Sequence, residues 1–230
     1  MSNALDENFI SRCRDFVAEW LNSHGERYFT VTDVTSVPNS PFRELARNSA
    51  LTDLIESLVR TTHIAQESDI LLQGDNLRII AGKNNDSQAM KFHYDSSVLT
   101  MLVPVFIPKG DAQTSGDLVL FPNKRKFGGS VIGNLFEKLA IQNRFTRARM
   151  AKKAACGLYN NNTIKLVPGS IYFFWGYRSL HANFSCLPGS LRATALFFFG
   201  NPQPNDVIMK MVTQRRIRAE NKIRDQSRQG

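Results

Sequence analysis

After about residue 68, the sequence becomes a succession of about eight short segments rich in β-branched and aromatic residues. Gly, Pro and Asn separate these segments, as is typical of strands joined by turns. The segments are residues 69–73, 77–82, 90–108, 116–122, 163–169, 170–177, 180–188 and 191–200. So many short strands in succession predict an antiparallel sandwich or barrel.

The first 67 residues predict helices that support this β-rich part. Residues 5–23 place apolar side chains at helical spacing, and residues 28–34 predict one short strand. Residues 39–63 predict one or two helices, with Ser40 as the N-cap and Pro41 at the first helical position.

A long segment, residues 123–160, interrupts the strands. In it we expect a loop, then a helix whose apolar side chains from Leu135 to Ile141 face the body, then a basic stretch. Long insertions between strands often frame a substrate. We therefore expect one domain over residues 1–206, followed by a basic helix or tail over residues 207–230. The domain would comprise helical support at about 1–67, a β core at about 68–200 and the basic helical insertion at about 123–160.

The net charge of +9 comes from two segments of the chain. Residues 123–153 carry nine Lys and Arg against one acidic residue, and residues 207–230 carry seven against two. The remainder of the chain is therefore net negative. Such clusters attract phosphates or acidic partners, although a solvated surface is an equal alternative.

The cysteine pattern and the chain's apolar runs favour a cytoplasmic protein. The three cysteines, Cys13, Cys156 and Cys186, are odd in number and lack C-x-x-C spacing, which argues against a disulfide framework and a structural zinc site. The acidic N-terminus lacks the apolar core of a signal peptide. Residues 98–108 form the longest apolar run, which is too short to cross a bilayer.

Five residues in two distant parts of the sequence predict a metal site. His93 and Asp95 lie two apart before an apolar strand, and alternate residues of a strand share a face. His181 lies in a late strand, and Arg192 and Thr194 follow in the next one. Two imidazoles and one carboxylate are the ligand set of non-haem Fe(II) oxygenases. A cosubstrate such as 2-oxoglutarate also needs a cation for its far carboxylate, which Arg192 could supply with the Thr194 hydroxyl as a second donor. The alternative is a polar strand start and a surface histidine.

This pattern resembles the Fe(II)/2-oxoglutarate-dependent dioxygenase superfamily, and within it the prolyl-4-hydroxylase-like branch. "GDLVLFP" resembles the GG-x-L-x-F strand of that branch, and residues 165–199 resemble its closing segment. The resemblance covers about residues 68–200. It implies a mainly β protein with flanking α-helices, in which a double-stranded β-helix (jelly roll, cupin-like) is supported by N-terminal helices. It also implies His93, Asp95 and His181 as catalytic iron ligands, and Arg192 with Thr194 as the 2-oxoglutarate-binding residues.

Four positions limit which reaction the resemblance implies. Prolyl hydroxylases commonly carry Lys where Arg192 stands, so prolyl hydroxylation is not implied, and Asp117 replaces the second glycine of the GG motif. Phe198 stands where AlkB-type demethylases carry a second Arg, which disfavours a nucleic-acid substrate. The presence of Asp95 favours hydroxylation or oxidative demethylation over halogenation.

The resemblance thus implies an enzyme that hydroxylates or oxidatively demethylates a substrate that the sequence does not identify, and the basic segments leave an anionic substrate open. Its requirements would be Fe(II), 2-oxoglutarate and O2, with ascorbate as an optional reductant, and its by-products succinate and CO2. The alternative is a non-catalytic β-helix or cupin-like binding module whose basic segments hold nucleic acid or another acidic partner. Tyr177, Arg178 and Asn183 flank the later histidine and are candidate substrate contacts.

Overall fold

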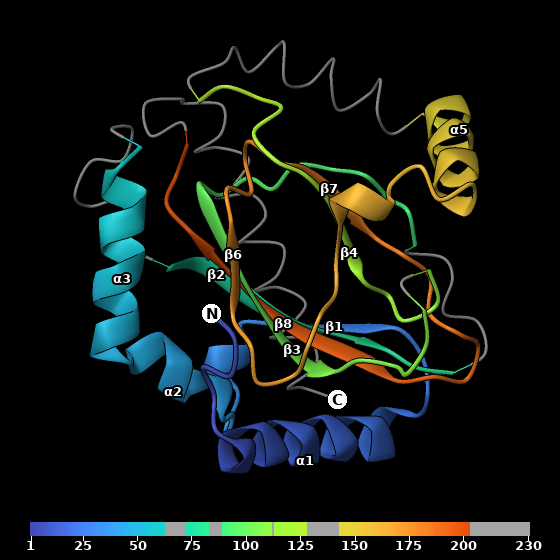
Figure 1. The fold of residues 1–230 in the computed structure, drawn as a ribbon. Helices are drawn as coiled ribbons and strands as arrows, with labels where there is room; N and C mark the ends of the chain where they lie inside the picture. The colour runs from blue at the N-terminus through green and yellow to red at the C-terminus, as the bar shows by residue number, and fades with distance from the viewer. Residues whose placement is uncertain (63–71, 83–88, 112, 128–142, 203–230) are drawn as a thin grey trace, which may run out of the picture.

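The computed structural model describes residues 1–62, 72–82, 89–111, 113–127 and 143–202, and it is built mainly from antiparallel strands (Figure 1). The helices are α1 (Glu7–His24), α2 (Phe42–Arg47), α3 (Ser49–Arg60) and α5 (Arg144–Ala155), with 3-10 turns η1 (Val34–Ser36) and η4 (Asn160–Asn162). The strands are β1 (Phe29–Thr32), β2 (Leu72–Ile80), β3 (Leu99–Phe106), β4 (Leu118–Phe121), β5 (Thr163–Ile164), β6 (Tyr172–Phe174), β7 (Leu180–Asn183) and β8 (Arg192–Phe199).

The strands form two antiparallel sheets. The larger has the order β1-β2-β8-β3-β6, and the smaller has the order β5-β4-β7. An isolated bridge between positions 93 and 181 adds a short partner to the outer side of β7. The pairs β2-β8, β8-β3, β3-β6 and β4-β7 join strands that are not consecutive in the sequence, which is the kind of connectivity found in a jelly roll. The predicted double-stranded β-helix with flanking helices is therefore confirmed.

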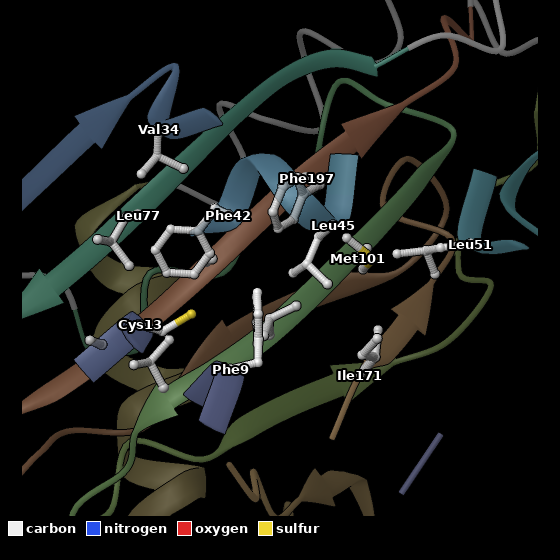
Figure 2. Packing of buried hydrophobic residues seen from close by; sticks show 14 of the residues in the cluster. Phe9, Cys13, Val34, Phe42, Leu45, Leu51, Leu77, Met101, Ile171 and Phe197 are labelled. Carbon is white, nitrogen blue, oxygen red and sulfur yellow. The ribbon is translucent and has the colours of Figure 1, made fainter. Parts of the chain in front are cut away.

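The outer face of the larger sheet packs against the N-terminal helices and forms the main core. Leu77, Met101 and Phe197, from three adjacent strands, are fully buried and belong to one cluster with Cys13 of α1 and Phe42 of α2 (Figure 2). Burying each large apolar side chain contributes about 1.5–3 kcal/mol. The apolar core thus forms between the helices and the outer face of the larger sheet, and polar residues can occupy the inner face without disrupting this core.

The inner face of the larger sheet changes character along β8. Leu196 packs with Leu102 and Leu118 in a small apolar cluster between the two sheets. Thr194 and Arg192, two and four residues earlier on the same face, are buried and polar. The polar end of the inner face is where the candidate site lies.

The helical predictions hold with one correction. Residues 39–63 contain two helices over their described part, and Asn48 caps α3 by accepting a hydrogen bond from the Leu51 amide at 2.9 Å. Ser40 is not an N-cap, because α2 begins at Phe42 and Pro41 occupies the cap position with helical dihedral angles. The Ser40 hydroxyl is buried and has no partner among the described residues.

Two strand predictions were wrong in their boundaries. The two strands expected at 69–73 and 77–82 are one strand from Leu72, with a register irregularity at Gly74; residues 69–71 lie outside the described part. The polar residue Asp75 continues the strand because its carboxylate accepts hydrogen bonds from the amide and hydroxyl of Thr35, at 3.0 and 2.7 Å. The strand expected over 90–108 is regular only from Leu99 to Phe106.

Parts of the predicted domain division lie outside the described residues. The helix expected near Leu135 and the tail 207–230 belong to these parts, so both stay predictions. Within the insertion, α5 forms where we expected a basic stretch. Among the described helices, none is long and apolar enough to cross a membrane.

Candidate metal centre

The two histidines are placed side by side by their own backbones. The His93 amide donates to the His181 carbonyl, and the His181 amide donates to the His93 carbonyl, both at 3.0 Å. This reciprocal pair forms an isolated antiparallel bridge, and the two imidazole ring centroids lie 4.3 Å apart. Peptide geometry therefore fixes the spacing of the two rings.

Asp95 reaches the histidines from an irregular segment. Its amide donates to the Gly176 carbonyl at 3.0 Å, and its Oδ2 accepts a hydrogen bond from the Thr100 hydroxyl at 2.5 Å. The Oδ1 atom lies 3.7 Å from His93 Nε2 and 3.5 Å from His181 Nε2. The expectation that His93 and Asp95 share the face of a regular strand was wrong, because His93 lies in the isolated bridge and Asp95 lies before β3.

Glycine is required at position 176 for the carboxylate to occupy this place. A Cβ atom there would lie 2.6 Å from Asp95 Oδ2 and 2.3 Å from the Thr100 hydroxyl oxygen. Both separations are shorter than any ordinary contact. The turn after β6 and the loop before β3 thus fit together only with a residue that lacks a side chain.

Both imidazoles are oriented so that their Nε2 atoms point toward Asp95. The Nδ1 atom of His93 lies 2.8 Å from the Lys91 carbonyl oxygen, and that of His181 lies 3.0 Å from the Ser179 carbonyl oxygen. A carbonyl can only accept, so each Nδ1 carries the hydrogen and donates it. The Nε2 lone pairs remain for a metal ion, which is the usual arrangement at histidine metal sites.

The electrostatics of the cluster favour a neutral His93 and an ionised Asp95. Burial and the neighbouring His181 lower the pKa of His93 to about 4. Burial opposes ionisation of Asp95, but the two imidazoles and the Thr100 hydroxyl outweigh it and hold the Asp95 pKa below its usual range. Burial also opposes charging of His181, yet the adjacent carboxylate outweighs it and raises the His181 pKa. A divalent cation would replace the proton that Asp95 attracts to His181.

These three side chains can hold a metal ion together. One ligand atom from each lies within 4.8 Å of the others, and the group consists of two imidazoles and one carboxylate on one side. This donor set suits Fe(II) and related divalent ions. These are the three residues that the sequence pattern groups as ligands, and their role as ligands remains a prediction.

Arg192 places a cation in the buried interior of the site. Its side chain is 1% exposed, and none of its three guanidinium nitrogens has a hydrogen-bond partner among the described residues. Burial lowers its pKa to about 10, so the group stays charged at neutral pH. A buried charge without a partner is costly, which indicates that the site is built for an anion. Gly116 leaves room for the side chain, since a Cβ there would lie 2.5 Å from Arg192 Cδ.

The other positions singled out from the sequence are also placed. Thr194 is buried on the same strand face as Arg192 and 1% exposed. Tyr177 is buried and Asn183 donates to the Gly116 carbonyl at 3.2 Å, so both contribute to packing around the site. Asp117 is buried, and its carboxylate accepts a hydrogen bond from the Leu166 amide.

Sequence reasoning missed the residues that support the ligands. Thr100 and Gly176 lie in an apolar strand and a turn, where nothing in the local pattern distinguishes them. Arg125 was seen only as part of a basic segment, yet its guanidinium lies 3.9 Å from the ring centroid of Tyr94 and 5.0 Å from that of Tyr177. This stacking joins the start of the 123–160 insertion to the segment that carries His93 and Asp95 and to the turn that precedes β7.

A larger cavity, of about 610 Å³, lies away from this cluster. Charged residues of α1 and α2 line it, among them Arg12 and Glu44, which form an exposed ion pair. The two helices cover the outer face of the larger sheet, whereas the candidate ligands and Arg192 belong to its inner side (Figure 1). The cavity is therefore separate from the metal centre.

Comparisons with known proteins show similarity in structure alone. No family model and no curated protein matches the sequence. HygX from Streptomyces hygroscopicus, solved with nickel and 2-oxoglutarate bound, aligns with a TM-score of 0.54 at 10% identity, covering 87% of this chain and 81% of that chain. The alpha-ketoglutarate-dependent epimerase SnoN of nogalamycin biosynthesis aligns with a TM-score of 0.52 at 17% identity, covering 86% and 76%. A Pseudomonas putida prolyl-4-hydroxylase aligns with a TM-score of 0.51 at 10% identity, covering 87% and 91%.

Proposed function

We propose that this chain, which has the fold of the 2-oxoglutarate-dependent non-haem oxygenases, is itself such an enzyme. It would use Fe(II), 2-oxoglutarate and O2 to hydroxylate or oxidatively demethylate a substrate. The observation that carries the proposal is the occurrence, inside one jelly roll, of a two-histidine, one-carboxylate cluster and a buried arginine that has no hydrogen-bond partner in the described part of the chain. The structure of HygX with nickel and 2-oxoglutarate, and that of SnoN with Fe3+ and alpha-ketoglutarate, support it by likeness of fold.

The residues fit the cofactor and the cosubstrate. His93, Asp95 and His181 would hold Fe(II), and Arg192 with Thr194 would bind the far carboxylate of 2-oxoglutarate. The bound iron would supply the oxidation: O2 and 2-oxoglutarate yield succinate, CO2 and one oxygen atom inserted into a C–H bond of the substrate.

The protein's contribution is to hold these groups in place. The carbonyls of Lys91 and Ser179 accept from both Nδ1 atoms and so orient each Nε2 toward Asp95, where a metal ion would replace the proton that the carboxylate attracts to His181. The Thr100 hydroxyl occupies one carboxylate oxygen of Asp95 and leaves Oδ1 facing the imidazoles. Burial of Arg192 strengthens its attraction for a carboxylate, because water does not compete for its donors.

The decisive assay is succinate formation from 2-oxoglutarate with Fe(II) and O2, with ascorbate as reductant. His93→Ala and Arg192→Gln should each remove at least about 90% of the rate, because each removes a charged or metal-binding partner. His24→Ala is the matched control, since His24 stacks on Trp20 at the end of α1 and belongs to the outer helices. If the wild-type protein binds neither the metal nor 2-oxoglutarate, the proposal is refuted and the non-catalytic binding module is favoured.

The cellular setting and the substrate class are further parts of the proposal. All three cysteines are free, as a reducing cytoplasm would require, and this supports cytoplasmic localisation. The departures from the prolyl hydroxylase and AlkB patterns at Arg192 and Phe198 leave the substrate undefined within hydroxylation and oxidative demethylation.

A further inference from the structure

Strand β2 carries polar groups on the face that it turns toward the candidate site. Arg78 is the cross-strand neighbour of Thr194, and Ile80 is the neighbour of Arg192. Residues opposite each other in an antiparallel pair lie on the same face. Arg78 therefore lies on the inner face beside the two residues proposed to bind the cosubstrate.

Arg78 has no protein partner for its charge among the described residues. Its Nε–H is buried and donates no hydrogen bond to any described residue. Buried polar groups in folded proteins are normally hydrogen-bonded. A buried donor without an acceptor, beside the residues proposed to bind the cosubstrate, indicates a place that a bound acceptor group completes.

The position of Arg78 relates it to the metal centre as well as to Arg192. Its charge acts through space on His93, His181 and Arg192. Arg78 and Ile80 also line a small hollow together with residues 183–186, which are the last residue of β7 and the three that follow it. Arg78 thus lies on the β2 wall of the site, across from the continuation of β7.

The charges of the cosubstrate leave Arg78 unused. 2-Oxoglutarate has two carboxylates, one at its metal-chelating end and one at its far end. The first would bind the metal and the second the fully buried Arg192. Arg78 is only partly buried, so a group arriving from solvent can reach its guanidinium.

We propose that Arg78 binds an anionic oxygen group, a carboxylate or a phosphate, on the substrate that is oxidised at the neighbouring metal centre. The inference rests on the proposed function, and it narrows the substrate to a molecule that carries such a group near the oxidised carbon. Arg78 is then a specificity-determining residue, which discriminates against neutral analogues because they leave its guanidinium unpaired.

The test uses inorganic phosphate and acetate as probes and Mn(II) as a paramagnetic substitute for iron. The Mn(II)-loaded protein is saturated with 2-oxoglutarate, and the relaxation of the phosphate ³¹P and acetate methyl ¹H signals is measured. We expect the wild-type protein to enhance relaxation of at least one probe, and the probe that responds identifies phosphate or carboxylate as the preferred group. Arg78→Gln should weaken the binding of that probe by about tenfold or more. Arg78→Lys should retain part of it, and Arg60→Gln on α3 is the control.

Titration calorimetry of 2-oxoglutarate on the same samples separates this inference from the proposed function. If the wild-type protein does not bind 2-oxoglutarate, the proposed function itself fails. If 2-oxoglutarate binds but the wild-type protein enhances the relaxation of neither the phosphate nor the acetate signal, the role of Arg78 is refuted. The role is also refuted if the Arg78→Gln protein enhances this relaxation as strongly as the wild type does. A tenfold loss of 2-oxoglutarate affinity in Arg78→Gln would also refute it, because Arg78 would then belong to the cosubstrate site. If the Arg78→Gln protein does not fold, the role of Arg78 is judged from the wild type and from Arg78→Lys. Relaxation enhancement that is present in the wild type and reduced in Arg78→Lys supports the role, and equal enhancement in the two proteins refutes it.

Discussion

Replacing Arg192 with methionine should make the ligand-free protein more stable while abolishing 2-oxoglutarate binding. The folded protein buries this guanidinium with no hydrogen-bond partner among the described residues, and burial lowers its pKa to about 10. Each pKa unit corresponds to about 1.4 kcal/mol, so keeping the charge in the folded state costs about 3 kcal/mol. Methionine removes the charge and fills most of the same space. After a small loss from imperfect packing, we expect a net gain of about 2 kcal/mol.

Urea denaturation followed by tryptophan fluorescence measures this gain. At neutral pH and without ligands, Arg192→Met should have a higher unfolding midpoint than the wild-type protein. With Mn(II) present and 2-oxoglutarate at about 100 times the Kd of 2-oxoglutarate, the free energy of unfolding of the wild type should rise by about 2.7 kcal/mol beyond the contribution of the metal. The variant should gain only the contribution of the metal. Arg60→Met, at an exposed ion pair on α3, should change stability by less than about 0.5 kcal/mol.

The pH dependence of the difference has a defined sign. Because the pKa of Arg192 is lower in the folded than in the unfolded protein, the unfolded chain binds more protons once the pH rises through about 10. Wild-type stability relative to the variant should therefore rise above that pH, and the gap should narrow. A ligand-free variant that is less stable than the wild type at neutral pH would refute the reasoning, since it would mean that the guanidinium has a favourable partner within the protein.

Two further predictions concern the packing of the metal centre and the reactivity of the thiols. Gly176→Ala should lower Mn(II) affinity by about tenfold to 100-fold because the added methyl group displaces the Asp95 carboxylate. Gly74→Ala, which adds its methyl group to open space, should leave the affinity unchanged. Calorimetric titration measures both variants, and a Gly176→Ala protein that binds Mn(II) as tightly as the wild type would contradict the described fit. In a thiol titration of the native protein, the exposed Cys156 should react quickly. Burial raises the pKa of Cys13 to about 12, so Cys13 should react only after denaturation. Rapid modification of Cys13 would contradict this prediction and show that α1 detaches readily from the sheet.

Much of the fold could be predicted because its strands have strong local signals. The segments around β3 and β8 are nearly continuous runs of apolar residues, so composition alone identifies them. Their boundaries depend on pairing instead. β2 continues through Gly74 and Asp75 because Thr35, forty residues earlier, satisfies the Asp75 carboxylate. No local pattern contains that information.

The candidate site divides in the same way. The grouping of His93, Asp95 and His181 was available from residue types and order, although the supposed shared strand face was not the reason they meet. Asp95 reaches the imidazoles through its backbone contact with Gly176. Arg78 could not be identified from the sequence, because its place beside the candidate site depends on the pairing of β2 with β8, which makes Thr194 its cross-strand neighbour.

The reciprocal backbone hydrogen bonds between His93 and His181 also constrain how the protein folds. The two residues come from opposite halves of the chain, and strands β3 to β6 lie between them in sequence. Closing so long a loop is a late and entropically expensive event. A metal ion therefore cannot find two imidazoles at their final spacing until the second sheet has been assembled. Tight metal uptake during refolding would thus follow closure of the barrel rather than guide it, and its rate would report when the last strands pair.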